Sequence, residues 1–145
     1  CAYGISKNSD LLEKNKKVSI KREIHSINFF GYISTRAAYE NGEIFVRELK
    51  DYIMQNILFT KNYFEKNQLK IDFFIPEATY LLWLDFSKMK LSHEEIKKLL
   101  LTKAKIALND GVSFSNKANG YFRLNTALSQ KALEIALNQL LATFK

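Results

Sequence analysis

The two most informative stretches of this chain read Pro76-Glu77-Ala78-Thr79-Tyr80-Leu81-Leu82-Trp83-Leu84-Asp85 and Gly120-Tyr121-Phe122-Arg123-Leu124-Asn125. Thr79 to Phe86 is an apolar run rich in β-forming residues, and Tyr121 to Thr126 has the same character. Each stretch therefore predicts a strand. A weaker alternation over Ile71–Ile75, which Pro76 ends, predicts one more strand that pairs with the Thr79 strand.

A long helix is predicted ahead of these strands. From about Glu43 to Lys66, six residues recur at alternating spacings of four and three, which places them on one stripe of a helix. They are Phe45, Leu49, Tyr52, Asn56, Phe59 and Tyr63. At roughly 1.5 Å per residue the helix is about 35 Å long. One small domain rarely needs such a length, so we expect part of its buried face to lack a partner in this chain.

Two shorter helices are expected before the long one. Ser9 to Arg22 has few apolar residues and begins with a good capping residue, Ser9, so we predict a mostly exposed helix. Ser26 to Tyr39 is rich in apolar and aromatic residues, which predicts a buried helix that starts at Ser26 or Asn28. Asn41-Gly42 then breaks the chain.

The segment after Phe86 predicts two more helices and a further strand. Ser92 and Glu95 have the spacing of a capping box at the start of one helix. Lys105 to Leu108 predicts a short strand, and Asn109-Asp110-Gly111 predicts a turn. The apolar face of the closing helix is formed by Leu133, Ala136, Leu137, Leu140, Leu141 and Phe144.

The order of these elements predicts the fold class. From the long helix onward it is helix, strand, strand, helix, strand, strand, helix. We therefore expect an α/β fold of two layers, in which a small mixed or antiparallel sheet is covered by helices on one face.

Composition and charge limit the possible partners. The 145 residues are 47% hydrophobic, enough for about one domain with a core. The net charge is +7, and the lysine-rich run from Lys14 to Arg22 would suit nucleic acid. No binding motif accompanies it, so we interpret these lysines as the solvated face of a helix and predict no nucleic-acid partner.

The single cysteine, Cys1, excludes an intrachain disulfide framework. The sequence contains no apolar run of about 18 residues and no signal-peptide pattern, so we predict a cytoplasmic protein without a membrane partner. The chain opens without Met and inside an expected strand, Ala2–Ser6. We therefore expect it to be part of a longer protein.

Most candidate chemical groups have ordinary interpretations. His25 and His93 lie far apart and have no Ser, Cys or carboxylate at a catalytic or metal-binding spacing, and His93 is expected at an exposed first helical position. No nucleotide-binding glycine pattern occurs, and we predict no metal site. Trp83 is expected in the core because its strand is nearly all apolar.

Arg123 is the most informative polar residue. It lies mid-strand between Phe122 and Leu124, so its side chain points to the opposite face from theirs and requires an anion. From the residues alone, that anion is equally well a bound ligand or a carboxylate of the chain such as Asp85 or Glu77.

Taken together, the two stretches resemble the C-terminal small domain of pyridoxal-phosphate enzymes of fold type I, the aspartate-aminotransferase fold. They are most similar to the cystathionine β-lyase-like C-S lyases and related aminotransferases. The resemblance runs through nearly the whole chain, although the first 70 residues match only in helix layout and around Asn28, Gly31 and Ala37-Ala38-Tyr39. It implies that residues 1–41 are a remnant of the large cofactor-binding domain, 42–67 the inter-domain helix and 68–145 the C-terminal small domain.

The resemblance also implies roles for particular residues. Arg123 would bind the α-carboxylate of the amino-acid substrate. Asn28 and Ser26 would support the cofactor phosphate of the neighbouring subunit in a homodimer, and Asn125 would satisfy backbone groups beside the site. Within Val112–Asn119, Phe114 matches the family, whereas the four residues after it replace an expected glycine-rich sequence.

The implied function is that of a pyridoxal 5'-phosphate-dependent C-S β-lyase acting on sulfur amino acids. In that family the Schiff-base lysine precedes the segment seen here, so we expect no catalytic residue in this chain and no activity from it alone. The alternatives are an aminotransferase of the same family and a non-catalytic basic binding or regulatory module. Arg123 would hold the carboxylate in either enzyme, so it does not discriminate lyase from aminotransferase.

Overall fold

The computed structural model describes residues 5–24 and 28–145 of the chain. These fall into two compact units, Cys1–Glu48 and Leu49–Lys145, each of which is described by itself. Within the described residues, no helix combines the length and apolar character needed to cross a membrane.

The first unit contains α1 (Ser9–Lys21), α2 (Phe29–Asn41) and the beginning of α3 (Glu43–Asn67). The cap of α1 is Asn8, whose side chain accepts a hydrogen bond from the Leu11 amide at 3.1 Å, so the prediction of Ser9 as the cap is wrong by one residue. Asn28 caps α2 in the same way, which selects the second of the two predicted starts. The expected strand Ala2–Ser6 lies mostly outside the described residues.

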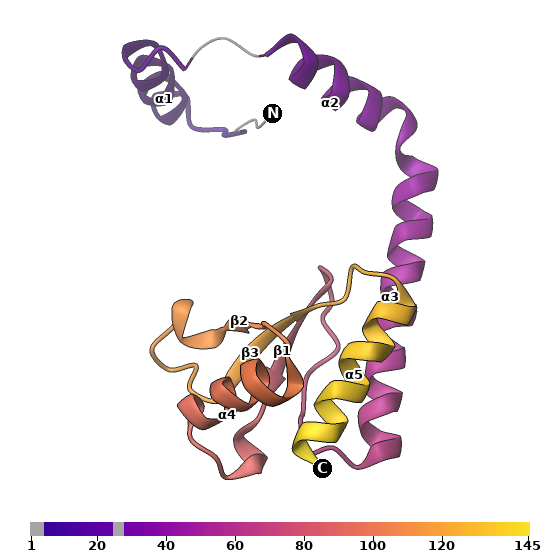
Figure 1. Cartoon of the computed structure of the whole chain (residues 1–145). Helices are drawn as coiled ribbons and strands as arrows, with labels where there is room; N and C mark the ends of the chain where they lie inside the picture. The colour runs from indigo at the N-terminus through magenta and orange to yellow at the C-terminus, as the bar shows by residue number, and fades with distance from the viewer. Residues whose placement is uncertain (1–4, 25–27) are drawn as a thin grey trace. The chain divides into compact units, whose positions relative to one another are not determined.

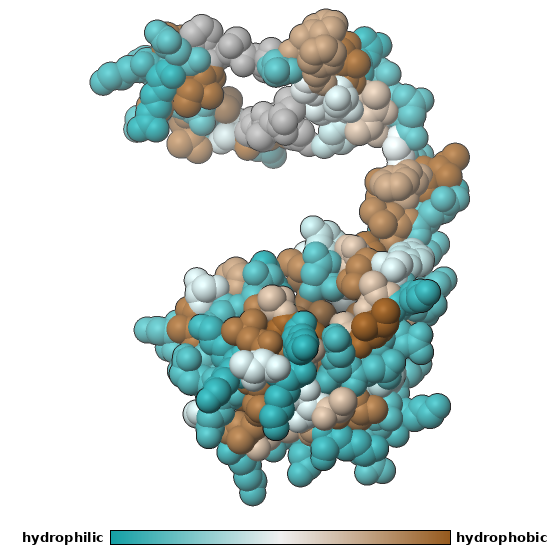
Figure 2. Space-filling view, in the orientation of Figure 1, coloured by the Kyte–Doolittle hydropathy of each residue, from teal (hydrophilic) through white to brown (hydrophobic). Residues whose placement is uncertain are grey.

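The prediction that α2 is a buried helix is wrong. Phe29 and Phe30 are 70% and 77% exposed, and no residue of α2 is buried. Figure 2 shows hydrophobic side chains at the surface of this unit. A helix buries its apolar face only against another surface, and the described residues of this unit supply none.

The second unit is a three-stranded antiparallel sheet with helices against it (Figure 1). Its strands are β1 (Leu81–Asp85), β2 (Asn109–Asp110) and β3 (Tyr121–Asn125), in the order β1-β3-β2. The helices are α4 (His93–Leu99), α5 (Gln130–Phe144) and the C-terminal part of α3, supplemented by single turns η1 (Ser87–Met89), η2 (Leu100–Ala104) and η3 (Gly111–Ser113). The predicted two-layer α/β class is confirmed.

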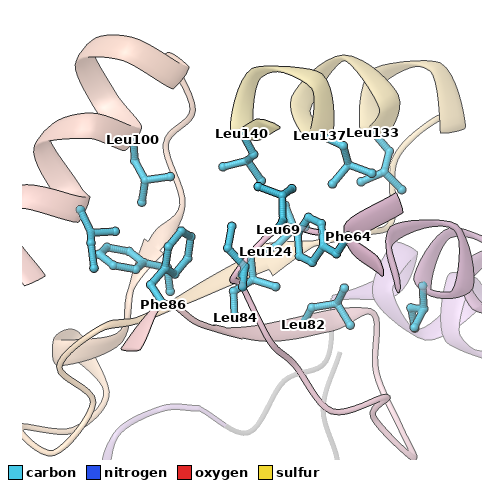
Figure 3. Packing of buried hydrophobic residues seen from close by; sticks show 14 residues of the cluster. Phe64, Leu69, Leu82, Leu84, Phe86, Leu100, Leu124, Leu133, Leu137 and Leu140 are labelled. Carbon is cyan, nitrogen blue, oxygen red and sulfur yellow. The ribbon is translucent and has the colours of Figure 1, made fainter. Parts of the chain in front are cut away.

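The core lies between one face of the sheet and the helices. Leu82 and Leu84 of β1 and Phe122 and Leu124 of β3 are buried, whereas the residues between them face the other side. They pack with Phe64 of α3, with Ile96 and Leu100, and with three leucines of α5, Leu133, Leu137 and Leu140 (Figure 3). The sheet therefore has one covered face and one face without a helix from this unit, which we call the open face.

Two predicted strands are absent from the described residues. Ile71–Ile75 contributes only a single antiparallel bridge, in which the backbones of Asp72 and Asp85 exchange hydrogen bonds of 3.0 and 2.8 Å. Lys105–Leu108 forms a connector, because Lys105 adopts a left-handed conformation that ends η2. Asn109–Asp110, predicted as a turn, instead forms β2, and its pairing with β3 is a long-range contact that no local pattern announces.

The long helix α3 is confirmed, and its predicted stripe is correct in part, since Asn56 is buried and Phe59 and Tyr63 pack partly buried against the core. Its buried residues are Asn56, Ile57, Thr60 and Phe64, whereas Phe45, Leu49 and Tyr52 are exposed. The exposed residues near its start fit the expectation that part of this face lacks a partner in the chain. A polar side chain helps the other half of the helix to dock. The Asn56 amide nitrogen donates to the carbonyls of Thr126 and Leu128, each at 2.9 Å, so the helix docks through this residue as well as through apolar contact.

The capping box of α4 is confirmed. The Glu95 amide donates to Ser92 Oγ at 3.3 Å, and the Ser92 amide donates to Glu95 Oε2 at 2.8 Å. These reciprocal bonds fix the first turn of α4 and so place His93 at its first helical position.

Candidate anion-binding site on the open face of the sheet

Arg123 occupies the middle of the central strand and projects on the open face. It pairs with Trp83 of β1 on one side and with Asn109 of β2 on the other. Its neighbours Phe122 and Leu124 point into the core, as predicted. The alternation of the strand therefore presents the guanidinium away from the helices.

The guanidinium is held by two groups and retains an unused donor. Its Nη2 donates to Asn109 Oδ1 at 3.1 Å, and its central carbon lies 4.5 Å from the centroid of the Phe114 ring. Its Nε is buried and has no hydrogen-bond partner among the described residues. A buried donor without a partner costs about 1–3 kcal/mol, so the surroundings of this nitrogen are unfavourable as they stand.

The expected alternative of an internal salt bridge is not formed. Within the described chain, neither Asp85 nor Glu77 makes an ion pair with Arg123. Asp85 instead accepts hydrogen bonds from the Tyr121 hydroxyl at 3.1 Å and from the Ser87 amide at 2.8 Å. The fixed plane and unpaired positive charge of Arg123 fit a carboxylate, which arginine binds through two parallel hydrogen bonds.

Aromatic residues surround this position on the open face. Trp83 stacks on Tyr121 with centroids 6.0 Å apart and meets Phe114 edge-on at 5.8 Å. Trp83 is 37% exposed, so its predicted place in the core is wrong, because it alternates with buried Leu82 and Leu84. Tyr121 donates a hydrogen bond from its hydroxyl to the Asp85 carboxylate, which raises the pKa of Tyr121 and keeps the phenol protonated.

A pocket of about 350 Å³ adjoins these aromatic residues. It is lined by Asp72, Phe73, Phe74, Trp83, Asp85 and Tyr121. The open face thus combines an arginine with a partly apolar recess.

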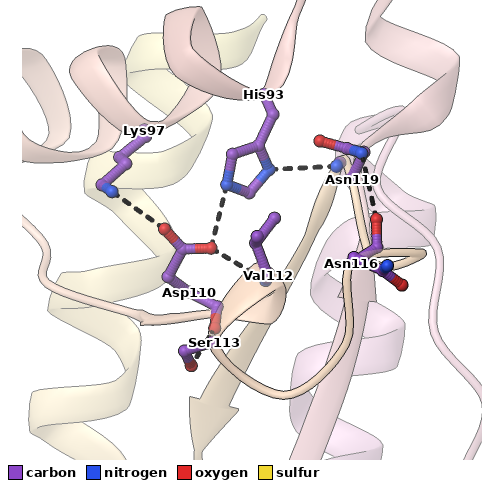
Figure 4. Close-up of polar contacts among 8 residues, drawn as sticks. His93, Lys97, Asp110, Val112, Ser113, Asn116 and Asn119 are labelled. Carbon is purple, nitrogen blue, oxygen red and sulfur yellow. Dashed lines mark hydrogen bonds and ion pairs between the residues drawn. The ribbon is translucent and has the colours of Figure 1, made fainter.

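His93 is part of a polar network behind this site (Figure 4). Its side chain is 8% exposed, so the prediction of an exposed residue is wrong. Nε2 lies 2.9 Å from Asp110 Oδ1, and Nδ1 accepts a hydrogen bond from the Gly120 amide at 3.1 Å. The imidazole also stacks on Phe122, with ring centroids 4.7 Å apart.

Asp110 joins the same network from β2. Its Oδ2 lies 2.9 Å from Lys97 Nζ, and its Oδ1 accepts from the Val112 amide at 3.0 Å. The hydrogen bond from Lys97 is the main cause that holds the Asp110 pKa below its usual value. Asp110 is therefore an anion near neutral pH and a firm anchor for the Lys97 and His93 side chains of α4.

The remaining predicted site residues are Asn125, Asn28 and Ser26. Asn125 Oδ1 accepts from the Ala127 amide at 2.8 Å, which confirms the predicted local backbone role. Asn28 caps α2, and Ser26 lies outside the described residues. No group of three or more His, Cys, Asp or Glu residues in the described part of the chain could hold a metal ion.

Sequence reasoning missed Asn109 and the three members of the network. Asn109 and Asp110 resemble ordinary turn residues, and the contacts that define their roles join residues 14 and 17 positions apart. The one available signal was the Ser92–Glu95 capping box, which places His93 and Lys97 four residues apart on α4.

Known proteins are similar to this chain in sequence and fold over part of their length. No family model matches the chain. Cystathionine beta-lyase PatB of Bacillus subtilis is 31% identical over 135 residues, which cover 92% of this chain and 35% of PatB. A PLP-bound protein of Clostridium difficile 630, described as an aminotransferase, is 34% identical with a TM-score of 0.93 over 97% of this chain and 36% of its own.

Cystalysin of Treponema denticola, whose crystal structure contains pyridoxal 5'-phosphate, is 25% identical with a TM-score of 0.86. That match covers 96% of this chain and 35% of cystalysin. The chain thus spans about a third of the length of the curated relatives and solved structures that it matches.

The small sheet covered by helices on one face, with the long helix before it in the chain, is the fold that these solved structures share with this chain. Over nearly its whole length the chain matches the C-terminal part of pyridoxal-phosphate enzymes of this fold, and its sequence relatives include cystathionine β-lyases.

Proposed function

We propose that this chain is the C-terminal part of a pyridoxal-phosphate-dependent C-S β-lyase that acts on sulfur amino acids such as cystathionine. The position of Arg123 on the open face, with no carboxylate of the described chain paired to it, carries the proposal, because such a guanidinium fits the α-carboxylate of an amino acid. The cystathionine β-lyase names of two relatives support the choice of reaction.

In this proposal, Arg123 binds and orients the substrate. Its guanidinium plane is fixed by Asn109 and Phe114, so a carboxylate pairs with it in one orientation. Pyridoxal phosphate, when bound, supplies an electron sink for charge that develops at the substrate Cα. The residues of this chain contribute the fixed position of the carboxylate rather than proton transfer.

Asn28 is proposed to support the cofactor phosphate of the neighbouring subunit in a homodimer, with Ser26 beside it. The Asn28 Oδ1 is used by the cap of α2, so such a contact would be made by its Nδ2, a hydrogen-bond donor suited to phosphate. Residues 1–41 would then belong to the large domain, 42–67 to the linking helix and 68–145 to the small domain, in a cytoplasmic enzyme. The 145 residues alone would be inactive.

An aminotransferase is the second candidate. The Clostridium difficile protein, described as an aminotransferase, matches this chain at 34% identity over nearly its whole length. Both reactions need the same carboxylate site, so Arg123 serves either one.

The test uses the full-length protein that contains this chain. Purified protein is examined for the visible absorbance of bound pyridoxal phosphate, then given cystathionine while pyruvate release is followed. Arg123→Ala is expected to raise KM about 100-fold, with a smaller change in kcat, because two charge-assisted hydrogen bonds are lost. Arg123→Lys restores the positive charge without the two parallel donors of the guanidinium, so it should reverse only part of the rise in KM.

Each outcome has a distinct meaning. Absorbance with pyruvate supports the lyase, and absorbance without pyruvate favours the aminotransferase. Absence of absorbance refutes both enzymes in favour of a binding or regulatory protein. An active lyase whose KM is unchanged by Arg123→Ala refutes the carboxylate role of Arg123.

A further inference from the structure

We infer that His93, Lys97 and Asp110 are positioning residues, which hold Asn109 and Phe114 against Arg123 and so set the orientation of the anion site. The inference rests on the proposed carboxylate role of Arg123. It assigns a purpose to the polar network that the proposed reaction does not otherwise use.

Strand β2 is very short. The strand contains only Asn109 and Asp110, which pair with Arg123 and Phe122 of β3. Two residues of backbone pairing at a sheet edge hold a strand weakly. The place of Asn109, and with it the hydrogen bond to Arg123, therefore depends on how its neighbour Asp110 is anchored.

Asp110 is anchored through its carboxylate. Both oxygens of the Asp110 carboxylate are engaged by α4, Oδ2 by Lys97 Nζ and Oδ1 by His93 Nε2, each at 2.9 Å. Figure 4 shows the two side chains reaching from the helix to β2. The helix thereby fixes the edge strand through two charge-assisted contacts.

The loop that carries Phe114 is held by the same network. His93 Nδ1 accepts a hydrogen bond from the Gly120 amide, so the proton of the neutral ring lies on Nε2 and is donated to Asp110. Near the other end of the loop, the Val112 amide donates to Asp110 Oδ1 and Ser113 Oγ donates to the Asp110 carbonyl. The network thus holds both ends of the loop between which Phe114 lies.

Gly111 shows how closely this loop crosses β3. A Cβ at Gly111 would lie 2.4 Å from the Tyr121 carbonyl oxygen, a distance that no side chain tolerates. The path of the loop over the central strand therefore leaves little room to move, and a shift at either anchor is transmitted to Phe114 and Arg123.

Two amide substitutions separate the functions of the two imidazole nitrogens. His93→Gln places an amide donor near the former Nε2 and retains the Asp110 contact, whereas His93→Asn retains an acceptor for Gly120 and loses the donor. Lys97→Met removes the second anchor from a partly exposed position. The matched control is Lys98→Met, an exposed lysine of the same helix that makes no ion pair within the described residues.

Two readouts are measured. In the full-length enzyme, His93→Asn and Lys97→Met are expected to raise KM for cystathionine about five- to ten-fold with kcat within about two-fold, because uniform carboxylate binding is weakened. Lys98→Met should stay near wild type, whereas His93→Gln, which keeps the donor to Asp110 but loses the acceptor for Gly120, should raise KM less than His93→Asn does. The second readout is the nuclear magnetic resonance signal of the Arg123 Nε–H in the isotopically labelled 145-residue chain, assigned by its loss in Arg123→Lys. This signal should shift in His93→Asn and in Lys97→Met.

The two readouts distinguish failure of this inference from failure of the proposed function. An unmoved Arg123 Nε–H signal in both His93→Asn and Lys97→Met overturns the positioning role, whether or not the enzyme is a lyase. A moved signal in the 145-residue chain, together with a full-length protein that has no lyase activity, supports the positioning role and refutes the proposed reaction. A fall in kcat with unchanged KM and signal marks the network as merely structural and overturns the inference.

Discussion

Replacing Asn56 by leucine tests how the long helix docks onto the small domain. Asn56 is 1% exposed, and its amide nitrogen donates to the carbonyls of Thr126 and Leu128, which follow β3, at 2.9 Å each. Leucine has a similar volume but no donor. The substitution therefore leaves two carbonyl groups without this partner while it disturbs the packing little.

The magnitude follows from the lost hydrogen bonds. Each carbonyl left unsatisfied costs about 1–3 kcal/mol, and removal of the unpaired Asn56 Oδ1 returns about 1 kcal/mol of the cost of its burial. The net expectation is a loss of about 3 kcal/mol in the free energy of unfolding. Losses of this size are a large fraction of the stability of a small domain.

The assay is urea denaturation of the 145-residue chain, followed by the fluorescence of its single tryptophan, Trp83. Asn56→Leu should lower the midpoint without changing the slope of the transition. Asn62→Leu is the matched control, since Asn62 is exposed on the same helix and should change stability by less than about 0.5 kcal/mol. Equal midpoints for wild type and Asn56→Leu would refute the view that this amide fixes α3 to the segment after β3.

Two further predictions concern acid stability and the cap of α4. Because its folded pKa is depressed, Asp110 contributes stability above about pH 4, and this contribution should be lost as pH falls through the folded value. Lys97→Met should reduce that acid-dependent loss in urea titrations across the pH series; an identical pH dependence would count against the ion pair. Ser92→Ala should cost about 1 kcal/mol in the same assay because the Glu95 amide loses its acceptor, and Ser92→Thr should largely restore it.

The successful sequence predictions rest on local patterns. The limits of α3, the capping box before α4, the strand at Tyr121 and the apolar face of α5 all follow from spacing within a few residues. The same reasoning placed Asn56 correctly on the buried stripe but did not find its partners, because an amide on an apolar stripe gives no sign of the two distant carbonyls that it satisfies. It failed for Trp83 because an apolar strand does not say which of its two faces is covered.

The amino-acid sequence alone determined the two-layer fold and drew attention to Arg123, since periodicity and strand alternation are properties of neighbouring residues. The tertiary structure decided what Arg123 meets: Asn109 and Phe114 hold it, and no carboxylate of the described chain pairs with it. It also turned His93 from an expected surface residue into the link between α4, β2 and the loop before β3. These contacts join residues 14, 17 and 27 positions apart, and only the packing of the sheet against its helices brings such residues within hydrogen-bonding distance.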